Sequence, residues 1–63
     1  MEESEARNRL SYAISPIEII LINRWLALRS MKSLYNHNCD KEIIKTEKAI
    51  KEFDKLVDEK ESE

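Results

Sequence analysis

The sequence predicts an all-α protein, folded as an antiparallel helical hairpin, and three observations support this prediction. Glycine is absent and proline occurs once among the 63 residues, so the residues that tight sheet turns need are missing. Lysine, glutamate, isoleucine and leucine dominate the composition, which is typical of helices. Apolar residues also recur at helical spacing in two long segments, which a short polar turn at residues 36–38 separates.

The length allows one domain with a small core, which is marginally stable without a covalent staple or a partner. Cys39 is the single cysteine, so an internal disulfide is excluded. With His37 it supplies too few ligands for a structural zinc site. We therefore expect no cofactor and no metal, and we expect self-association or a partner protein.

Residues 1–14 form a charged lead-in. Ala6, Leu10, Ala13 and Ile14 fall at helical spacing, which predicts a short helix or turn. Acidic residues occupy the place of the basic region of a signal peptide, so we expect no export signal and a reducing cytoplasm as the location.

The first long helix is predicted over residues 15–35, and its start has a capping-box pattern. Ser15 is the expected N-cap, Pro16 the first helical residue, and Glu18 the residue that reaches back to the Ser15 N–H. The apolar run at residues 17–22 contains Glu18 and is too short to span a membrane.

The second helix is predicted over residues 41–59, with a loose acidic tail at residues 60–63. Asn36 suits the left-handed end of the preceding helix, and Asp40 or Asn38 can cap the new one. A turn this short makes the two helices antiparallel. The second helix has one narrow apolar stripe, made by Ile43, Ile44, Ala49, Ile50, Phe53, Leu56 and Val57.

Helix 15–35 carries nearly two apolar stripes, and the single stripe of helix 41–59 can cover only one of them. The leftover side chains predict a partner-binding surface. It consists of Ile19, Ile20, Ile22, Trp25, Leu26 and Arg29. Our main expectation is a homodimer, in which two hairpins form a four-helix bundle. The alternatives are that residues 1–14 fold back with Leu10, Tyr12 and Ile14, or that a foreign protein covers the surface.

No pattern of catalytic residues emerges. His37 and Cys39 lie on a short turn without an orienting third group, and helix carboxylates such as Asp54 and Asp58 face solvent, where no pocket can tune a pKa. The phosphate-binding glycine loop is excluded because the chain has no glycine.

Nucleic-acid binding is a further alternative, in which a dimer would use Arg7, Arg9, Arg24 and Arg29. Residues 1–39 carry five cations and four acids, and residues 40–63 carry six lysines and nine acids. This balance is not the basic footprint that nucleic acid requires.

Residues 50–58, Ile-Lys-Glu-Phe-Asp-Lys-Leu-Val-Asp, resemble the signature helix of the Spo-zero-E-like aspartyl-phosphate phosphatases. That hallmark reads Ser-Gln-Glu-Leu-Asp, then a basic or polar residue, Leu and Ile. Glu52 and Asp54 match it, whereas isoleucine and lysine stand in place of serine and glutamine. The family consists of short cytoplasmic helical hairpins of spore-forming Firmicutes, and the composition suits such a bacterium or its phage.

The resemblance implies a partner and an activity. The family removes phosphate from the aspartyl-phosphate of a sporulation response regulator, by docking on it and positioning the attacking water. Glu52 and Asp54 would lie at that contact. The residues themselves favour a small cytoplasmic regulatory protein that acts by protein–protein interaction through helix surfaces, and the phosphatase is the alternative.

Overall fold

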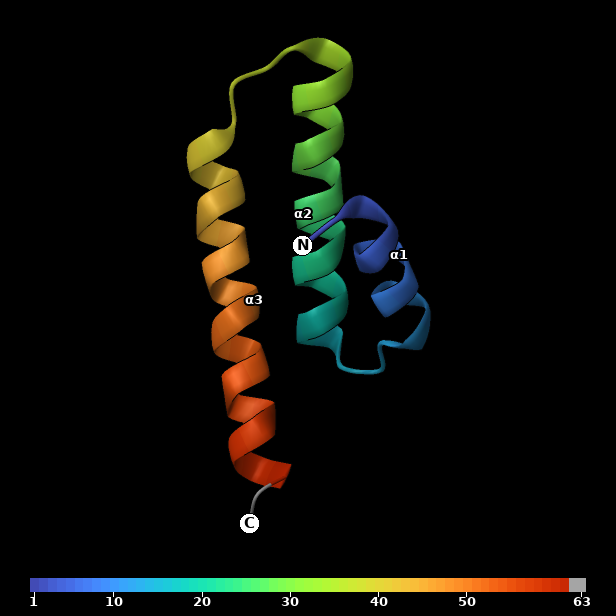
Figure 1. Cartoon of the computed structure of the whole chain (residues 1–63), viewed down its shortest axis with the longest axis vertical. Helices are drawn as coiled ribbons and strands as arrows, with labels where there is room; N and C mark the ends of the chain where they lie inside the picture. Colours follow the sequence, from blue (N-terminus) through green and yellow to red (C-terminus); the bar gives the residue numbers. More distant parts are fainter. Residues whose placement is uncertain (62–63) are drawn as a thin grey trace.

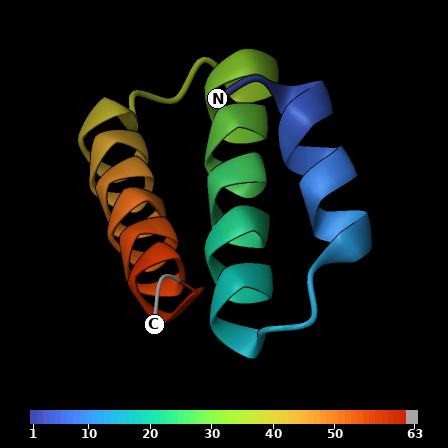
Figure 2. The same ribbon diagram turned by 60° about the horizontal axis from the view of Figure 1, so that its bottom comes forward.

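A computed structural model describes residues 1–61 and contains three helices in that range: α1 (Glu3–Tyr12), α2 (Pro16–Tyr35) and α3 (Asp40–Glu61). The described part has no strand, which confirms the all-α prediction. α2 and α3 lie side by side and run in opposite directions, and α1 lies along another side of α2 (Figures 1 and 2). α2 is therefore the central helix, because both other helices pack on it.

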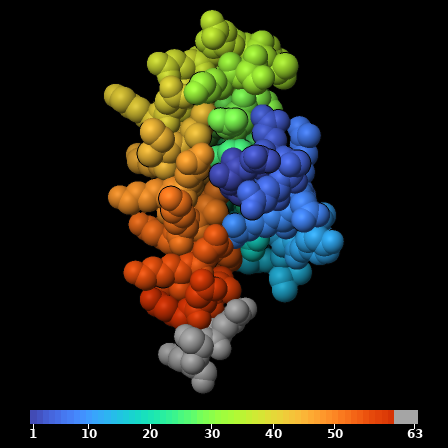
Figure 3. Space-filling view, in the orientation of Figure 1, coloured from blue at the N-terminus to red at the C-terminus, as the bar shows by residue number. Residues whose placement is uncertain are grey.

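α1 folds back onto α2, as the alternative in which residues 1–14 cover helix 15–35 predicts. Ala6 is fully buried and Leu10 packs against the core, whereas Tyr12 and Ile14 are exposed. The carboxylate of Glu5 accepts a hydrogen bond from the Glu2 N–H at 3.4 Å, which helps to fix the first turn. Figure 3 shows that α1 covers the part of α2 beneath it.

α2 begins where the sequence predicts, but its capping box does not form. Pro16 is the first helical residue, and the Ile19 N–H donates to the Ser15 carbonyl at 3.0 Å. The Ser15 side chain makes no cap hydrogen bond. The carboxylate of Glu18 accepts instead from Arg9 Nε at 2.9 Å, a bond between two charged groups that is stronger than a bond to a neutral backbone N–H.

The turn between α2 and α3 depends on its asparagines. Asn36 adopts the left-handed conformation with φ 52°, as predicted, and the His37 N–H donates to the Met31 carbonyl at 3.3 Å. The Asn38 side chain accepts from the Asp40 N–H at 3.3 Å. The N-cap is Cys39, whose carbonyl accepts from the Ile43 N–H at 3.0 Å, so neither predicted residue occupies the cap position. α3 then continues to Glu61, past the predicted helix end; residues 62–63 of the predicted tail lie outside the described residues.

The core lies where α2 meets both neighbours. It consists of Ala6, Ile22, Trp25, Leu28, Cys39, Ile43 and Ile50. The fully buried Trp25 donates its indole N–H to Glu47 at 3.0 Å, and the Cys39 thiol donates to the Leu28 carbonyl at 3.2 Å. The predicted stripe of α3 is only partly used, because Ile44 and Leu56 remain exposed.

Candidate functional site

Five of the six predicted partner-binding residues are buried or half-buried in the structure. Ile22 and Trp25 are fully buried, and Ile19, Leu26 and Arg29 are half-buried. These side chains lie on the sides of α2 that α1 and α3 cover. Of the predicted surface only Ile20 is exposed, and the prediction is wrong for Ile22 and Trp25, which are fully buried.

The open surface lies on the opposite side of α2, and we call it the outer stripe. It consists of Ile17, Ile20, Arg24, Ala27, Met31 and Leu34, all of them exposed. Ile20 is 65% exposed and Leu34 is 74% exposed, although both are large apolar side chains. The residues alternate at spacings of three and four, which is the repeat of a coiled-coil seam.

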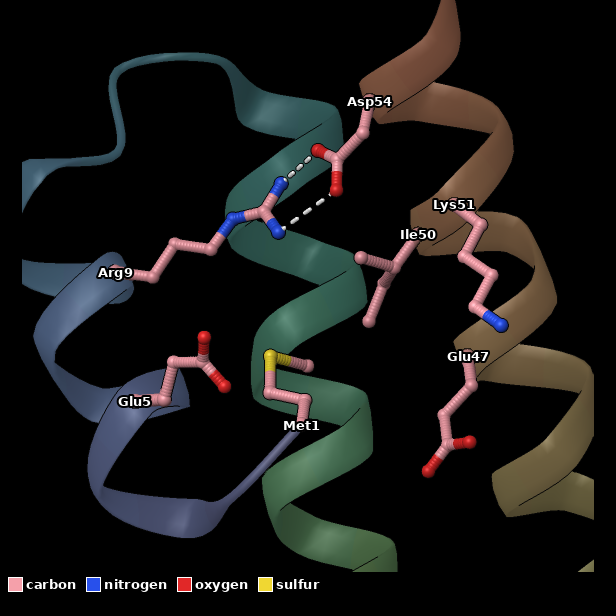
Figure 4. Close-up of a pocket in the computed structure, with 7 residues that line it drawn as sticks. All are labelled: Met1, Glu5, Arg9, Glu47, Ile50, Lys51 and Asp54. Atoms are coloured by element: carbon pink, nitrogen blue, oxygen red, sulfur yellow. Dashed lines mark hydrogen bonds and ion pairs between the residues drawn. The ribbon is translucent and has the colours of Figure 1, made fainter.

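The second candidate region is a groove between α1 and α3, which we call the inner groove. It has a volume of about 250 Å³ and is open to solvent (Figure 4). Its lining consists of Met1, Glu5, Arg9, Glu47, Ile50, Lys51 and Asp54. The groove therefore combines three carboxylates and two cations with two apolar side chains.

Arg9 ties the three helices together at this groove. From α1 its Nη1 donates to Asp54 Oδ2 on α3 at 3.0 Å, and Nη2 donates to the other oxygen of the same carboxylate (Figure 4). Its Nε donates to Glu18 on α2. The hydrogen bond to Asp54, and then the bond to Glu18, raise the pKa of Arg9 above its ordinary value against the opposing effect of burial. No local sequence pattern reveals this link, because 45 residues separate Arg9 from Asp54.

The two residues assigned by the family resemblance do not form a pair. Asp54 holds Arg9, and its side chain is 47% exposed. Glu52 is exposed and lies two residues away, which on a helix places it on a different side. Ile50, at the position of the hallmark serine, belongs to the core.

The inner groove is lined by no serine, threonine, cysteine or histidine. Within residues 1–61 no group of three His, Cys, Asp or Glu side chains is placed to hold a metal ion. The groove's chemistry is that of ion pairing between helices.

The four arginines of the predicted nucleic-acid patch are divided among different surroundings. Arg7 lies 3.9 Å from Glu3, Arg9 is held in the inner groove, and Arg24 belongs to the outer stripe. The guanidinium carbon of Arg29 lies 5.4 Å from the centroid of the Trp25 ring.

Comparison with known proteins gives no match: no family model fits the chain, and neither curated proteins nor solved structures show significant similarity to it. In the described part of the chain no helix is long and apolar enough to cross a membrane.

Proposed function

We propose that this chain is a small cytoplasmic regulatory protein that acts by protein–protein contact, and that the outer stripe of α2 is its contact surface. The observation that carries the proposal is the row of large apolar side chains left exposed after folding. Ile17, Ile20 and Leu34 are each at least 60% exposed, and Met31 is 38% exposed. Large apolar side chains that gather on one exposed side of a folded protein mark interaction sites.

The carboxylates near the inner groove support the same proposal, because their hydrogen bonds join the helices of the fold. Glu18 and Asp54 hold Arg9, and Glu47 accepts from Trp25. These carboxylates stabilise the packing of the helices. The outer stripe, in contrast, is left exposed, although Arg24 at its edge lies beside Lys45 and Thr46 of α3.

Site-specific photo-crosslinking in the source cells tests this proposal. A photoreactive phenylalanine analogue at Ile20 should give a covalent adduct with whatever protein lies on the outer stripe. Ile44 is the matched control, since it is also 65% exposed but lies on α3 among lysines. The adduct at position 20 should disappear when Met31→Lys is added. Equal adducts from positions 20 and 44, or none from position 20, would contradict the proposal.

A response-regulator phosphatase is a second proposal, supported by the match at Glu52 and Asp54 and by the exposure of Glu52. Its test is the release of phosphate from a phosphorylated regulator by the full chain. Glu52→Ala and Asp54→Ala should each slow the release. Arg9→Ala is the control for Asp54, because it breaks the same ion pair and leaves the carboxylate in place. If Asp54→Ala releases phosphate as fast as the parent chain, the role assigned to Asp54 is wrong.

A further inference from the structure

We infer that the occupant of the outer stripe is a second copy of this chain, with the two α2 helices packed antiparallel. This inference rests on the proposed function and names the partner. Ile17 would lie opposite Leu34 of the second copy, and Ile20 opposite its Met31. At the centre Arg24 would lie opposite Ala27 of the second copy.

The outer stripe is complementary to itself in this orientation. Its two ends each carry two large apolar residues, and its centre carries one long and one small residue. An antiparallel pair therefore matches large residues at both ends and places Arg24 over a methyl group. The same patch then serves both copies, as a two-fold symmetric interface requires.

Charge separation favours the antiparallel orientation over the parallel one. In a parallel pair in register the two Arg24 side chains would lie level with each other, where like charges repel, whereas the antiparallel pair offsets them by three residues, about 4.5 Å along the helix axis. In the antiparallel pair the aliphatic part of Arg24 lies along Ala27, and its charged end reaches the edge of the seam. The opposed directions of the two helix dipoles also favour this arrangement.

The position of α3 supplies an acidic partner for Arg24. Within one chain Leu21 and Arg24 face Lys45, Thr46 and Ala49, while the Leu28 carbonyl meets Cys39. The two-fold operation puts both α3 helices on the same side of the α2 pair, which gives a four-helix bundle. In that register the exposed Glu42 of the second copy lies level with Arg24.

Cysteine crosslinking of the full chain tests the orientation. In a Cys39→Ala background, the double variant Ile20→Cys with Met31→Cys should form disulfide-linked dimers under mild oxidation, because position 20 lies opposite position 31. Each single variant should stay uncrosslinked. Ile44→Cys with Leu56→Cys, which also places two thiols at exposed apolar positions, should crosslink only at the collisional rate.

Crosslinking of the single variants would overturn the antiparallel orientation in favour of the parallel one. Equal yields from the double variant and from the control pair would overturn the interface altogether. If the chain sediments as a monomer and photo-crosslinking at Ile20 captures a different protein, the second copy is excluded while the proposed contact surface stands.

Charge reversal tests the register independently. Arg24→Glu should raise the dimer dissociation constant at least about tenfold in sedimentation equilibrium, because it faces Glu42 of the second copy. Adding Glu42→Arg should recover most of that loss. Glu52→Arg is the matched control on the same helix and should recover none. An equal recovery by both variants, or by neither, would contradict the register.

Discussion

The two sides of α2 differ in how completely the chain covers them. On the inner side Ile22 and Trp25 are fully buried beneath α1 and α3, and the polar groups around them are hydrogen-bonded. On the outer side Ile17, Ile20 and Leu34 remain exposed. One helix thus carries two apolar surfaces, of which folding covers one and leaves the other exposed.

α1 decides which surface is used, although its own apolar contribution is small. Ala6 is the one residue of α1 that is fully buried. Leu10 adds a partly buried apolar contact, and the ion pairs of Arg9 supplement this small apolar attachment of α1.

Truncation of one isoleucine on each side of α2 tests the difference between the two sides most strongly. Ile22→Ala should lower the free energy of unfolding by about 2–5 kcal/mol, because it leaves a cavity in the core. Ile20→Ala should change it by less than about 0.5 kcal/mol in the monomer, because that side chain is exposed. Urea unfolding followed by circular dichroism at low protein concentration measures both. Similar losses of unfolding free energy for the two variants would contradict the difference in burial between the two sides of α2.

A smaller effect should follow from releasing α1. Arg9→Ala should cost about 1–2 kcal/mol of unfolding free energy, since it removes charge-assisted hydrogen bonds that are partly exposed to solvent. It should also shift the fluorescence of Trp25 to longer wavelength as water reaches the ring.

Arg7→Ala is the matched control for this prediction, because Arg7 lies on the same helix and its ion pair with Glu3 is solvent-exposed. It should cost less than about 0.5 kcal/mol. Added salt should narrow the gap between the two variants, because it screens the ion pairs of Arg9. Unchanged Trp25 emission in Arg9→Ala would refute the role of Arg9 in holding α1.

An effect of similar size to that of Arg9→Ala concerns the polar contact of the inner side. Trp25→Phe removes the indole N–H that donates to Glu47, and we expect a loss of about 1–2 kcal/mol, which includes the smaller ring. Glu47→Gln keeps an acceptor oxygen and should cost less. Circular dichroism provides the measurement, since the Phe variant lacks the fluorophore. Additive losses in the double variant would show that the two side chains are not coupled.

The sequence predicted the parts of the fold that depend on local chemistry. Pro16 marks the start of α2 and Asn36 its left-handed end, because both effects act within a few residues. The capping box failed because Glu18 has a distant competitor in Arg9, which no local pattern reveals.

The candidate surface was predicted less well, for a geometric reason. Periodicity shows that α2 has two apolar stripes, but it does not show which stripe a neighbouring helix covers. Ile20 and Ile22 both belong to the predicted partner-binding surface. Ile20 is exposed, whereas Ile22, two residues further on, is fully buried in the core. The helical spacing of Ala6 and Leu10 predicts that α1 is a helix. It does not predict which side of α2 this helix covers.

The contact between Arg9 and Asp54 has a consequence for the order of folding. The packing of α1 on α2 and of α2 on α3 joins neighbours in the chain, which favours rapid folding. The link from Arg9 to Asp54 closes a loop of 45 residues and brings α1 and α3 together across α2, so we expect it to form after both neighbouring pairs. Loss of this link should therefore accelerate unfolding and leave the rate of folding nearly unchanged.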